Sequence, residues 1–211
     1  MPSPVDTNEP EQTAERRFTV DDALAQLPLL RIGYKGVRGN TPDAYAMQLL
    51  GTVLGGGQSS RLYQKLVKEK QLTLSANSFA STRRGPGSFQ LSANIAPGKK
   101  IEDVEAAIYE EIAKLQTEPI ADWELAKAKQ FAKRSAVGSR SSSLGLAINL
   151  TEYVVSYNDP NLINTQLDKM MAVTKEDVQR VARKYLQANY RTVGIAIPKP
   201  KTMGAAPTAG R

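Results

Sequence analysis

Hydrophobic residues in this chain change between two spacings, and the order of these changes limits the folds that the chain can adopt. Apolar and polar residues alternate in Leu72–Thr82 and in Ser88–Pro97, which the turn-rich segment RRGPG joins. This pattern predicts a β-hairpin with one buried face. Before the hairpin, apolar residues recur at helical spacing and predict a helix with an inner stripe of Ala46, Leu49, Leu50, Val53 and Leu54.

Further segments of both kinds surround these regions. Arg16–Val20 is predicted as a short edge strand, Leu29–Gly36 as a second strand and Arg191–Pro198 as the last strand. Several helical segments separate the hairpin from the last strand, and the first of them has inward residues Ile101, Val104, Ile108, Ile112 and Leu115. Strands and helices in this order, without regular βαβ alternation, predict an α+β fold with a mostly antiparallel sheet and helices packed on one face.

Short polar residues mark the starts of three predicted helices. Thr41 or Asp43 can cap the first helix, and Asp122 is the expected cap of a later one. Thr174 followed by Asp177 has the spacing of a capping box, in which each side chain binds the other residue's backbone amide. These residues predict where the helices begin.

Three consecutive glycines, Gly55–Gly57, stand in the stretch LGGGQSSRLYQKL. They follow a predicted helix, whereas a phosphate-binding loop follows a strand, and this excludes a nucleotide loop. Gly55 is expected to end the helix in the left-handed conformation. Ser59 or Ser60 is expected to cap a second helix, with an inner face of Leu62, Leu66 and Val67. Two interpretations remain, a tight corner between helices or a bare backbone that another chain can approach.

Two residue types that carry much of enzyme chemistry are missing. The 211 residues include no histidine and no cysteine, which excludes the usual zinc sites and any Ser-His-Asp or Cys-His relay. The net charge is +7, but the basic residues are spread along helices among 21 acidic ones, which favours a solvated face over a nucleic-acid site. No apolar run approaches the ~20 residues of a membrane span, and the N-terminus does not resemble a signal peptide.

The composition divides the chain into three parts. Residues 1–15 are expected to be a linker or the cut end of a longer chain, and residues 201–211 a disordered tail. The interval 16–200 is expected to be one domain, because the 41% hydrophobic content of the whole chain is enough for a sizeable core.

Three stretches together resemble the M16 family of zinc metallopeptidases, the group of pitrilysin, insulinase and mitochondrial processing peptidase. They are LGGGQSSRLYQKLVKEKQL, AVTKEDVQRVARKYLQ and RTVGIAIPKP, in the order and spacing of the family's second, C-terminal-type domain. The resemblance runs from about Arg16 to Pro200 and implies the fold shared by LuxS and the processing-peptidase metallohydrolases.

The resemblance also implies a role. Members of the family pair two similar domains around a chamber, and the first domain holds zinc through an H-x-x-E-H motif. A chain without histidine would then be the non-catalytic half, with no cofactor of its own and zinc in the partner. Its expected partners are that H-x-x-E-H domain, on the same parent chain or a separate subunit, and a peptide substrate, with a dimer left open. A bacterial parent in the cytoplasm or periplasm is expected. The alternative is a scaffold subunit with the family fold and no peptidase activity.

Six residues are candidates for lining the chamber. Many family members place an arginine and a tyrosine near the substrate from this domain, and the matching positions here hold Val67 and Leu74. Neither side chain can donate a hydrogen bond to a carbonyl or an oxyanion, so no catalytic residue is expected in this chain. The other candidates form the glycine stretch Gly55, Gly56, Gly57 and Gln58.

Overall fold

The computed structural model describes residues 10–199, which form five strands and six α-helices with two short helical turns of other types. The strands are β1 (Arg16–Asp22), β2 (Leu29–Arg38), β3 (Thr73–Ser81), β4 (Pro86–Ile95) and β5 (Arg191–Pro198). The α-helices are α1 (Pro42–Gly55), α2 (Ile101–Thr117), α3 (Asp122–Gly138), α4 (Ser143–Tyr157), α5 (Leu162–Met171) and α6 (Lys175–Tyr185). A π-helix, η1 (Tyr63–Glu69), follows α1, and a 3-10 turn, η2 (Ala188–Tyr190), precedes β5.

The five strands form one sheet in the order β1-β5-β2-β4-β3. Pairs β2–β4, β2–β5 and β3–β4 are antiparallel, and only β1 with β5 is parallel. The hairpin, the edge strand β1 and the last strand are therefore confirmed, and β2 runs two residues beyond the predicted Gly36. Each strand of the hairpin has one buried face because polar and apolar residues alternate along it.

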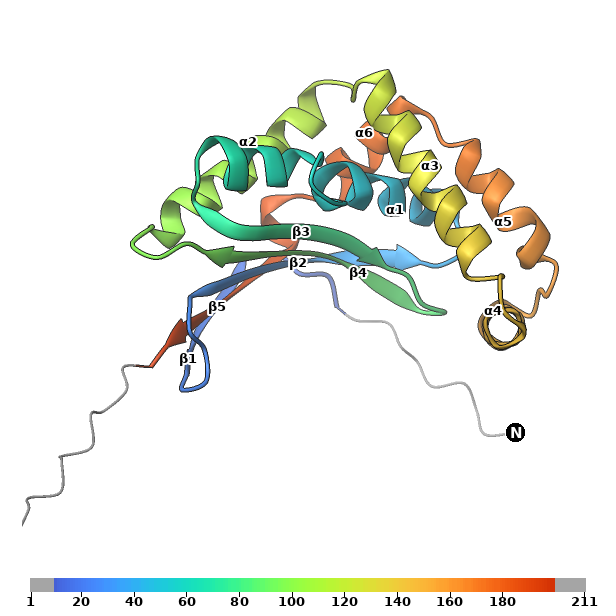
Figure 1. Cartoon of the computed structure of the whole chain (residues 1–211), viewed down its shortest axis with the longest axis horizontal. Helices are drawn as coiled ribbons and strands as arrows, with labels where there is room; N and C mark the ends of the chain where they lie inside the picture. Colours follow the sequence, from blue (N-terminus) through green and yellow to red (C-terminus); the bar gives the residue numbers. More distant parts are fainter. Residues whose placement is uncertain (1–9, 200–211) are drawn as a thin grey trace, which may run out of the picture.

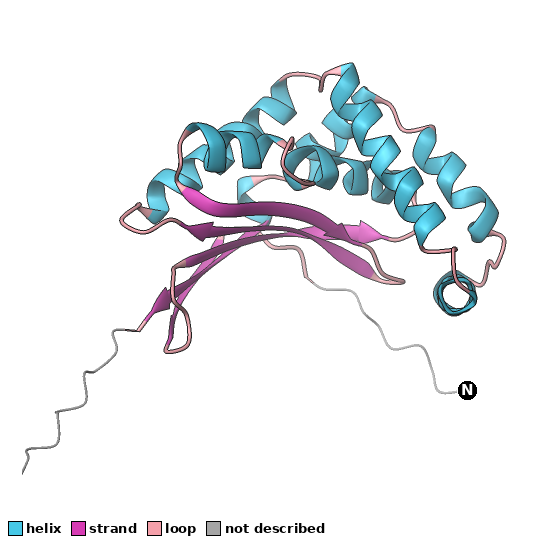
Figure 2. Cartoon of the chain, in the orientation of Figure 1, coloured by secondary structure: helices cyan, strands magenta, loops and turns pink. Residues whose placement is uncertain are grey.

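The helices cover one side of the sheet, and the other side is uncovered in the part of the chain that the structure describes (Figure 1, Figure 2). The core lies between these layers and contains alternate strand residues, among them Leu30, Ile32, Phe89 and Leu91. The predicted α+β class, with helices on one face of a mostly antiparallel sheet, is confirmed. The predicted linker and tail lie largely outside the described residues. Of the linker, Gln12 is buried and donates to the carbonyl of Arg191 at 2.7 Å.

Helix α1 lies in the middle of the helical layer, and most of its residues are buried. It crosses β3 so closely that a Cβ on Gly55 would lie 2.0 Å from the backbone nitrogen of Ser78. The hydroxyl of Ser78 donates to the carbonyl of Gly51 at 2.9 Å and joins the two elements at this crossing. Gly55 is therefore needed for close packing, and its predicted left-handed conformation is wrong, because the positive φ of 87° belongs to Gly57.

The predicted caps have mixed outcomes. Thr41 caps α1, and the box of Thr174 with Asp177 opens α6, as expected. The serine cap is wrong, because the hydroxyl of the buried Ser60 donates to the carbonyl of Gly57 at 2.6 Å instead of accepting from a helix amide. The cap at Asp122 is also wrong, because this residue is already the first of α3.

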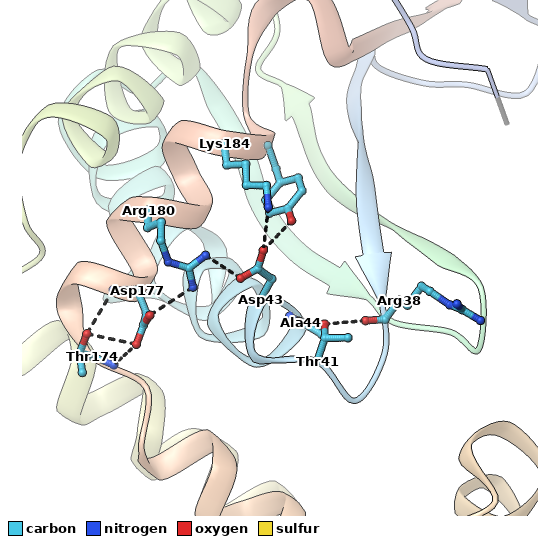
Figure 3. Close-up of polar contacts among 9 residues, drawn as sticks. Arg38, Thr41, Asp43, Ala44, Thr174, Asp177, Arg180 and Lys184 are labelled. Carbon is cyan, nitrogen blue, oxygen red and sulfur yellow. Dashed lines mark hydrogen bonds and ion pairs between the residues drawn. The ribbon is translucent and has the colours of Figure 1, made fainter. Parts of the chain in front are cut away.

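The carboxylate of Asp43, in the first turn of α1, binds side chains along α6 and so joins the two helices (Figure 3). Asp43 accepts from Arg180 at 2.6 Å, from the hydroxyl of Tyr185 at 2.5 Å and from Lys184 at 3.4 Å. Arg180 also donates to Asp177 at 3.1 Å, so the capping box of α6 belongs to the same network. Burial alone would raise the pKa of Asp43, but the hydrogen bonds from Tyr185 and Arg180 outweigh it and leave the pKa below its ordinary value.

Replacing Gly55 by alanine is expected to push α1 away from β3. The added methyl group overlaps backbone rather than a movable side chain, so unfolding free energy should fall by about 3 kcal/mol. The matched control is Gly138→Ala at the end of α3, where a Cβ meets nothing within 4 Å. Urea denaturation should show the control unchanged or slightly stabilised; equal stability of the two variants would contradict the close-packing role.

Replacing Asp43 by asparagine should lower the unfolding free energy by about 1–2 kcal/mol at neutral pH, because charge-assisted hydrogen bonds are lost. The folded-state pKa is depressed, so this stabilisation is present above the unfolded pKa and disappears as pH falls through the folded one. The deficit should therefore shrink below about pH 4. Asp103→Asn, an exposed acid in the first turn of α2, controls for the helix dipole and should cost only a few tenths of a kcal/mol.

Candidate functional site

The candidate residues of the glycine stretch divide into two groups. Gly55 is buried against β3, and Gly56 follows it with its amide bound to the carbonyl of Thr52 at 2.9 Å. Gly57 and Gln58 are exposed, and a Cβ on Gly57 would meet nothing within 4 Å. Gly55 and Gly56 therefore pack and hydrogen-bond within this chain. Of the four candidates, only Gly57 and Gln58 offer open backbone to another molecule.

Val67 and Leu74 lie on neighbouring elements, η1 and β3, which pack against each other. Val67 is half-buried on the π-helix, whereas Leu74 is 58% exposed and lies where the pairing of β3 with β4 shifts register, between Thr73 and Ser75. Both positions present only hydrocarbon, so they can bound a chamber or pack against apolar groups, but they cannot polarise a substrate carbonyl.

Arg61, within the same sequence stretch, has a role that the sequence did not indicate. Its guanidinium donates twice to Glu124 on α3, at 2.7 Å for each bond. Glu124 also accepts from the amide of Ala121 at 2.9 Å, which starts α3 in place of the expected aspartate. Burial would raise the pKa of Glu124, but these hydrogen bonds outweigh it and hold the pKa below its ordinary value. The pair fixes the glycine corner to α3 and leaves Arg61 committed to structure.

The uncovered face of the sheet, here called the open face, carries polar side chains along the hairpin strands. Its β4 residues are Ser88, Gln90, Ser92 and Asn94, which alternate with the buried Phe89, Leu91, Ala93 and Ile95. The pairing of β2 and β3 with β4 places Arg31 beside Ser92 and Phe79 beside Gln90, so both lie on this face as well. The alternation in the sequence was the signal for this face, although its residues were not singled out as candidates.

Amide and hydroxyl groups dominate the open face and bind one another locally. Asn94 donates to Ser75 across the hairpin at 2.8 Å, and Gln90 donates to Ser88 at 2.8 Å. A shallow cavity of about 220 Å³ lies on this face, and its lining includes Phe18, Arg31, Gln90, Thr192 and Gly194. Such groups can both donate to and accept from a peptide backbone without selecting a particular side chain.

Titratable groups at the β1–β5 edge are engaged in pairs. Glu105 on α2 accepts from Arg17 and from the hydroxyl of Tyr109 at 2.5 Å, and these bonds outweigh burial to lower the pKa of Glu105. Arg191 stacks 3.9 Å from the ring centre of Tyr109 and pairs with Glu15. Burial raises the pKa of Tyr34 to about 12, which keeps its hydroxyl neutral at physiological pH. These residues hold the sheet edge and do not form a nucleophile activated by a base.

The family is shown by comparison with known proteins. The family model described as the peptidase M16 inactive domain matches residues 2–131. The zinc protease PqqE of Helicobacter pylori is 28% identical over 198 residues, which are 94% of this chain and 44% of that protein. The chain spans less than half the length of such curated relatives.

Solved structures agree in fold. The crystal structure of a protease from Helicobacter pylori superposes with a TM-score of 0.85 at 27% identity, over 93% of this chain and 47% of that one. The inactive peptidase domain of a zinc protease from Bordetella parapertussis gives 0.77 at 27% identity, over 85% of this chain and 95% of that one. The chain belongs to the M16 peptidase family, as an inactive C-terminal-type domain of its zinc proteases.

Proposed function

We propose that this chain is the non-catalytic half of a zinc-dependent M16 metalloendopeptidase and encloses peptide substrate against an H-x-x-E-H domain that the chain does not contain. The observation that carries the proposal is an M16 inactive domain with one face of its sheet uncovered and rich in amide and hydroxyl groups. The substrate class would be peptides or short unfolded segments, because only an extended chain exposes its backbone to such a face.

The residues of this chain do not fit a zinc ion. Zinc sites in proteins rely on histidine and cysteine, and this sequence has neither. Among residues 10–199 there is also no group of three acidic side chains that could hold a metal. Zinc chemistry, the attack of an activated water on the peptide carbonyl, therefore belongs to the partner domain. This chain would contribute binding, orientation and the exclusion of bulk water.

The open face suits an extended peptide for two reasons. Asn77, Gln90 and Ser92 can hydrogen-bond to backbone groups, which recur in every peptide whatever its sequence. Phe79, 51% exposed on the same face, and Phe18 offer aromatic contact to apolar side chains. Leu74, on the edge strand β3, and Val67, on η1 packed against that strand, would add hydrocarbon at this edge of the sheet.

A scaffold role is the second candidate, and a specific observation favours it. By the family resemblance, Val67 and Leu74 hold the positions where many members carry an arginine and a tyrosine, so this chain would lack those polar groups near the metal. A subunit that has the family fold but serves only in assembly would not need the arginine and the tyrosine. No helix within residues 10–199 is long and apolar enough to cross a bilayer.

Mixing the purified chain with an H-x-x-E-H domain from the same organism tests the proposal. Cleavage of a quenched fluorescent peptide should rise at least about tenfold over the catalytic domain alone, the effect of enclosing and orienting substrate. The chain alone should cleave nothing and hold no stoichiometric zinc by elemental analysis. A complex that forms without any gain in cleavage would support the scaffold instead.

Phe79→Ser provides a finer test of the open face in that reconstituted enzyme. Loss of aromatic contact should raise KM by about three- to tenfold with little change in kcat, because ground state and transition state lose the same binding. Trp123→Ser is the control, because Trp123 is also an exposed aromatic residue but lies in the first turn of α3 in the helical layer. Equal KM values for both variants and the wild type would place the peptide elsewhere.

A further inference from the structure

Helix α4 packs incompletely against the rest of the helical layer. None of its residues is buried, and Leu144, Ile148 and Val155 form an exposed apolar stripe along it. In Figure 1, where α4 is seen end-on, it lies beside the lower ends of α3 and α5. A cavity of about 330 Å³ remains among α1, α3, α4 and α5. This volume lies at the lower end of the range of about 300–1,000 Å³ that small-molecule pockets occupy.

Small side chains on α3 leave the room for this cavity. Ala132, Ser135, Ala136 and Ser139 line it at spacings of three and four residues, which places them on one face at the C-terminal end of α3. None of these side chains extends more than one atom beyond Cβ, so they cannot fill the distance to α4 and α5. The sequence of α3 therefore leaves a space among the four helices.

The cavity has an apolar part and a polar part. Leu49 and Met170, which are buried, and Phe131, which is 48% exposed, contribute hydrocarbon from α1, α5 and α3. Neutral hydrogen-bonding groups come from Gln48, Thr52, Asn149, Tyr153 and Gln166. A ligand that matches both parts has an apolar body and a polar group at one end.

Arg140 is the only charged residue that lines the cavity. It is partly buried and lies near the hydroxyl of Tyr153; burial raises the pKa of Tyr153, and the charge of Arg140 partly offsets the rise. Among residues 10–199, no carboxylate forms an ion pair with Arg140. Glu152, the only acidic residue of α4, is exposed and accepts from Ser156 at 2.6 Å. The guanidinium is therefore available to an anion that enters the cavity.

We propose that this cavity binds a small carboxylic acid, with the carboxylate on Arg140 and an apolar body against Phe131 and Met170. The planar guanidinium can donate two parallel hydrogen bonds to a carboxylate. A single positive charge matches a monoanion, whereas a dianion would leave one charge unpaired in a partly buried site. A bound acid contacts α4 together with α1 and α3, and so fastens α4 to the helical layer.

The inference goes beyond the proposed function and does not depend on it. The cavity lies within the helical layer, whereas the open face is the other side of the sheet. The site can therefore be tested on this chain without a catalytic partner.

An NMR titration of the purified chain tests the site, with phenylacetate as the probe and the neutral phenylacetamide as the matched ligand. The acid should bind with a Kd of about 1 mM or tighter. The amide should bind at least about tenfold more weakly, because it cannot form the charge-assisted hydrogen bonds. Arg140→Gln should abolish this difference. Lys133→Gln, which removes the same charge from an exposed position of α3 outside the cavity, should retain it.

A second variant tests the cavity itself. Ala136→Met places a flexible apolar side chain in the space, and binding of acid and amide should both fall at least about tenfold. Its melting temperature shows whether the fold is retained; if it is not, the comparison of Arg140→Gln with Lys133→Gln decides by itself. In the wild type, the backbone amides that shift on addition of the acid should belong to α1, α3, α4 and α5.

Each outcome supports or overturns the inference. Equal affinity for acid and amide, or undiminished binding of the acid by Arg140→Gln, overturns the assignment of the carboxylate to Arg140. No binding by the wild type, shifts confined to the strands, or full binding by a folded Ala136→Met variant overturns the site. Tighter binding of inorganic phosphate than of phenylacetate overturns the class of ligand. None of these results changes the proposed function, whose test is peptide cleavage in the reconstituted enzyme.

Discussion

The contact between α1 and β3 sets the geometry of the helical layer. Because Gly51 and Gly55 lack side chains, the helix rests on the backbone of Phe79 and Ser78 rather than on a layer of side chains. This close approach fixes α1 as the buried centre around which the other helices pack. It also places the glycine corner, because Gly56 and Gly57 directly follow the crossing point at Gly55.

Two ion pairs stabilise this packing, one at the start of α1 and one beyond its end, after the glycine corner. Asp43 joins the start of α1 to α6, and Arg61, just after the glycine corner, joins this corner to α3 through Glu124. Both carboxylates are ionised more readily than usual because their hydrogen bonds outweigh burial. Asp43 and Arg61 therefore stabilise the domain through ion pairs within it.

The consequence of placing the helices on one side is a domain with two unlike surfaces. The helical side is sealed by its own core, whereas the open face and α4 are left without a cover in residues 10–199. The two surfaces differ in chemistry, because the sheet face offers hydrogen-bonding groups and the helix α4 offers mainly hydrocarbon. The role proposed for this inactive domain requires only shape and position, without a catalytic group of its own.

The sequence by itself determined the class of fold, because alternating and helical spacings of apolar residues report which face of each element is buried. It also excluded a zinc site of the usual kind, since the absence of histidine and cysteine needs no structure to interpret. Local caps were less secure: Thr41 and Thr174 behaved as expected, but Ser60 and Asp122 did not, because the carbonyl of Gly57 and the carboxylate of Glu124 made the competing hydrogen bonds.

Only the tertiary structure decided what Gly55 is for, since the strand that it contacts is 23 residues further along the chain at Ser78. It likewise showed that Arg61 is paired and that the apolar stripe of α4 faces outward rather than into the core. Helical spacing indicates that an apolar stripe must be covered, but not by which partner. That choice depends on where the chain places the helix, and here the chain places it outside its own core.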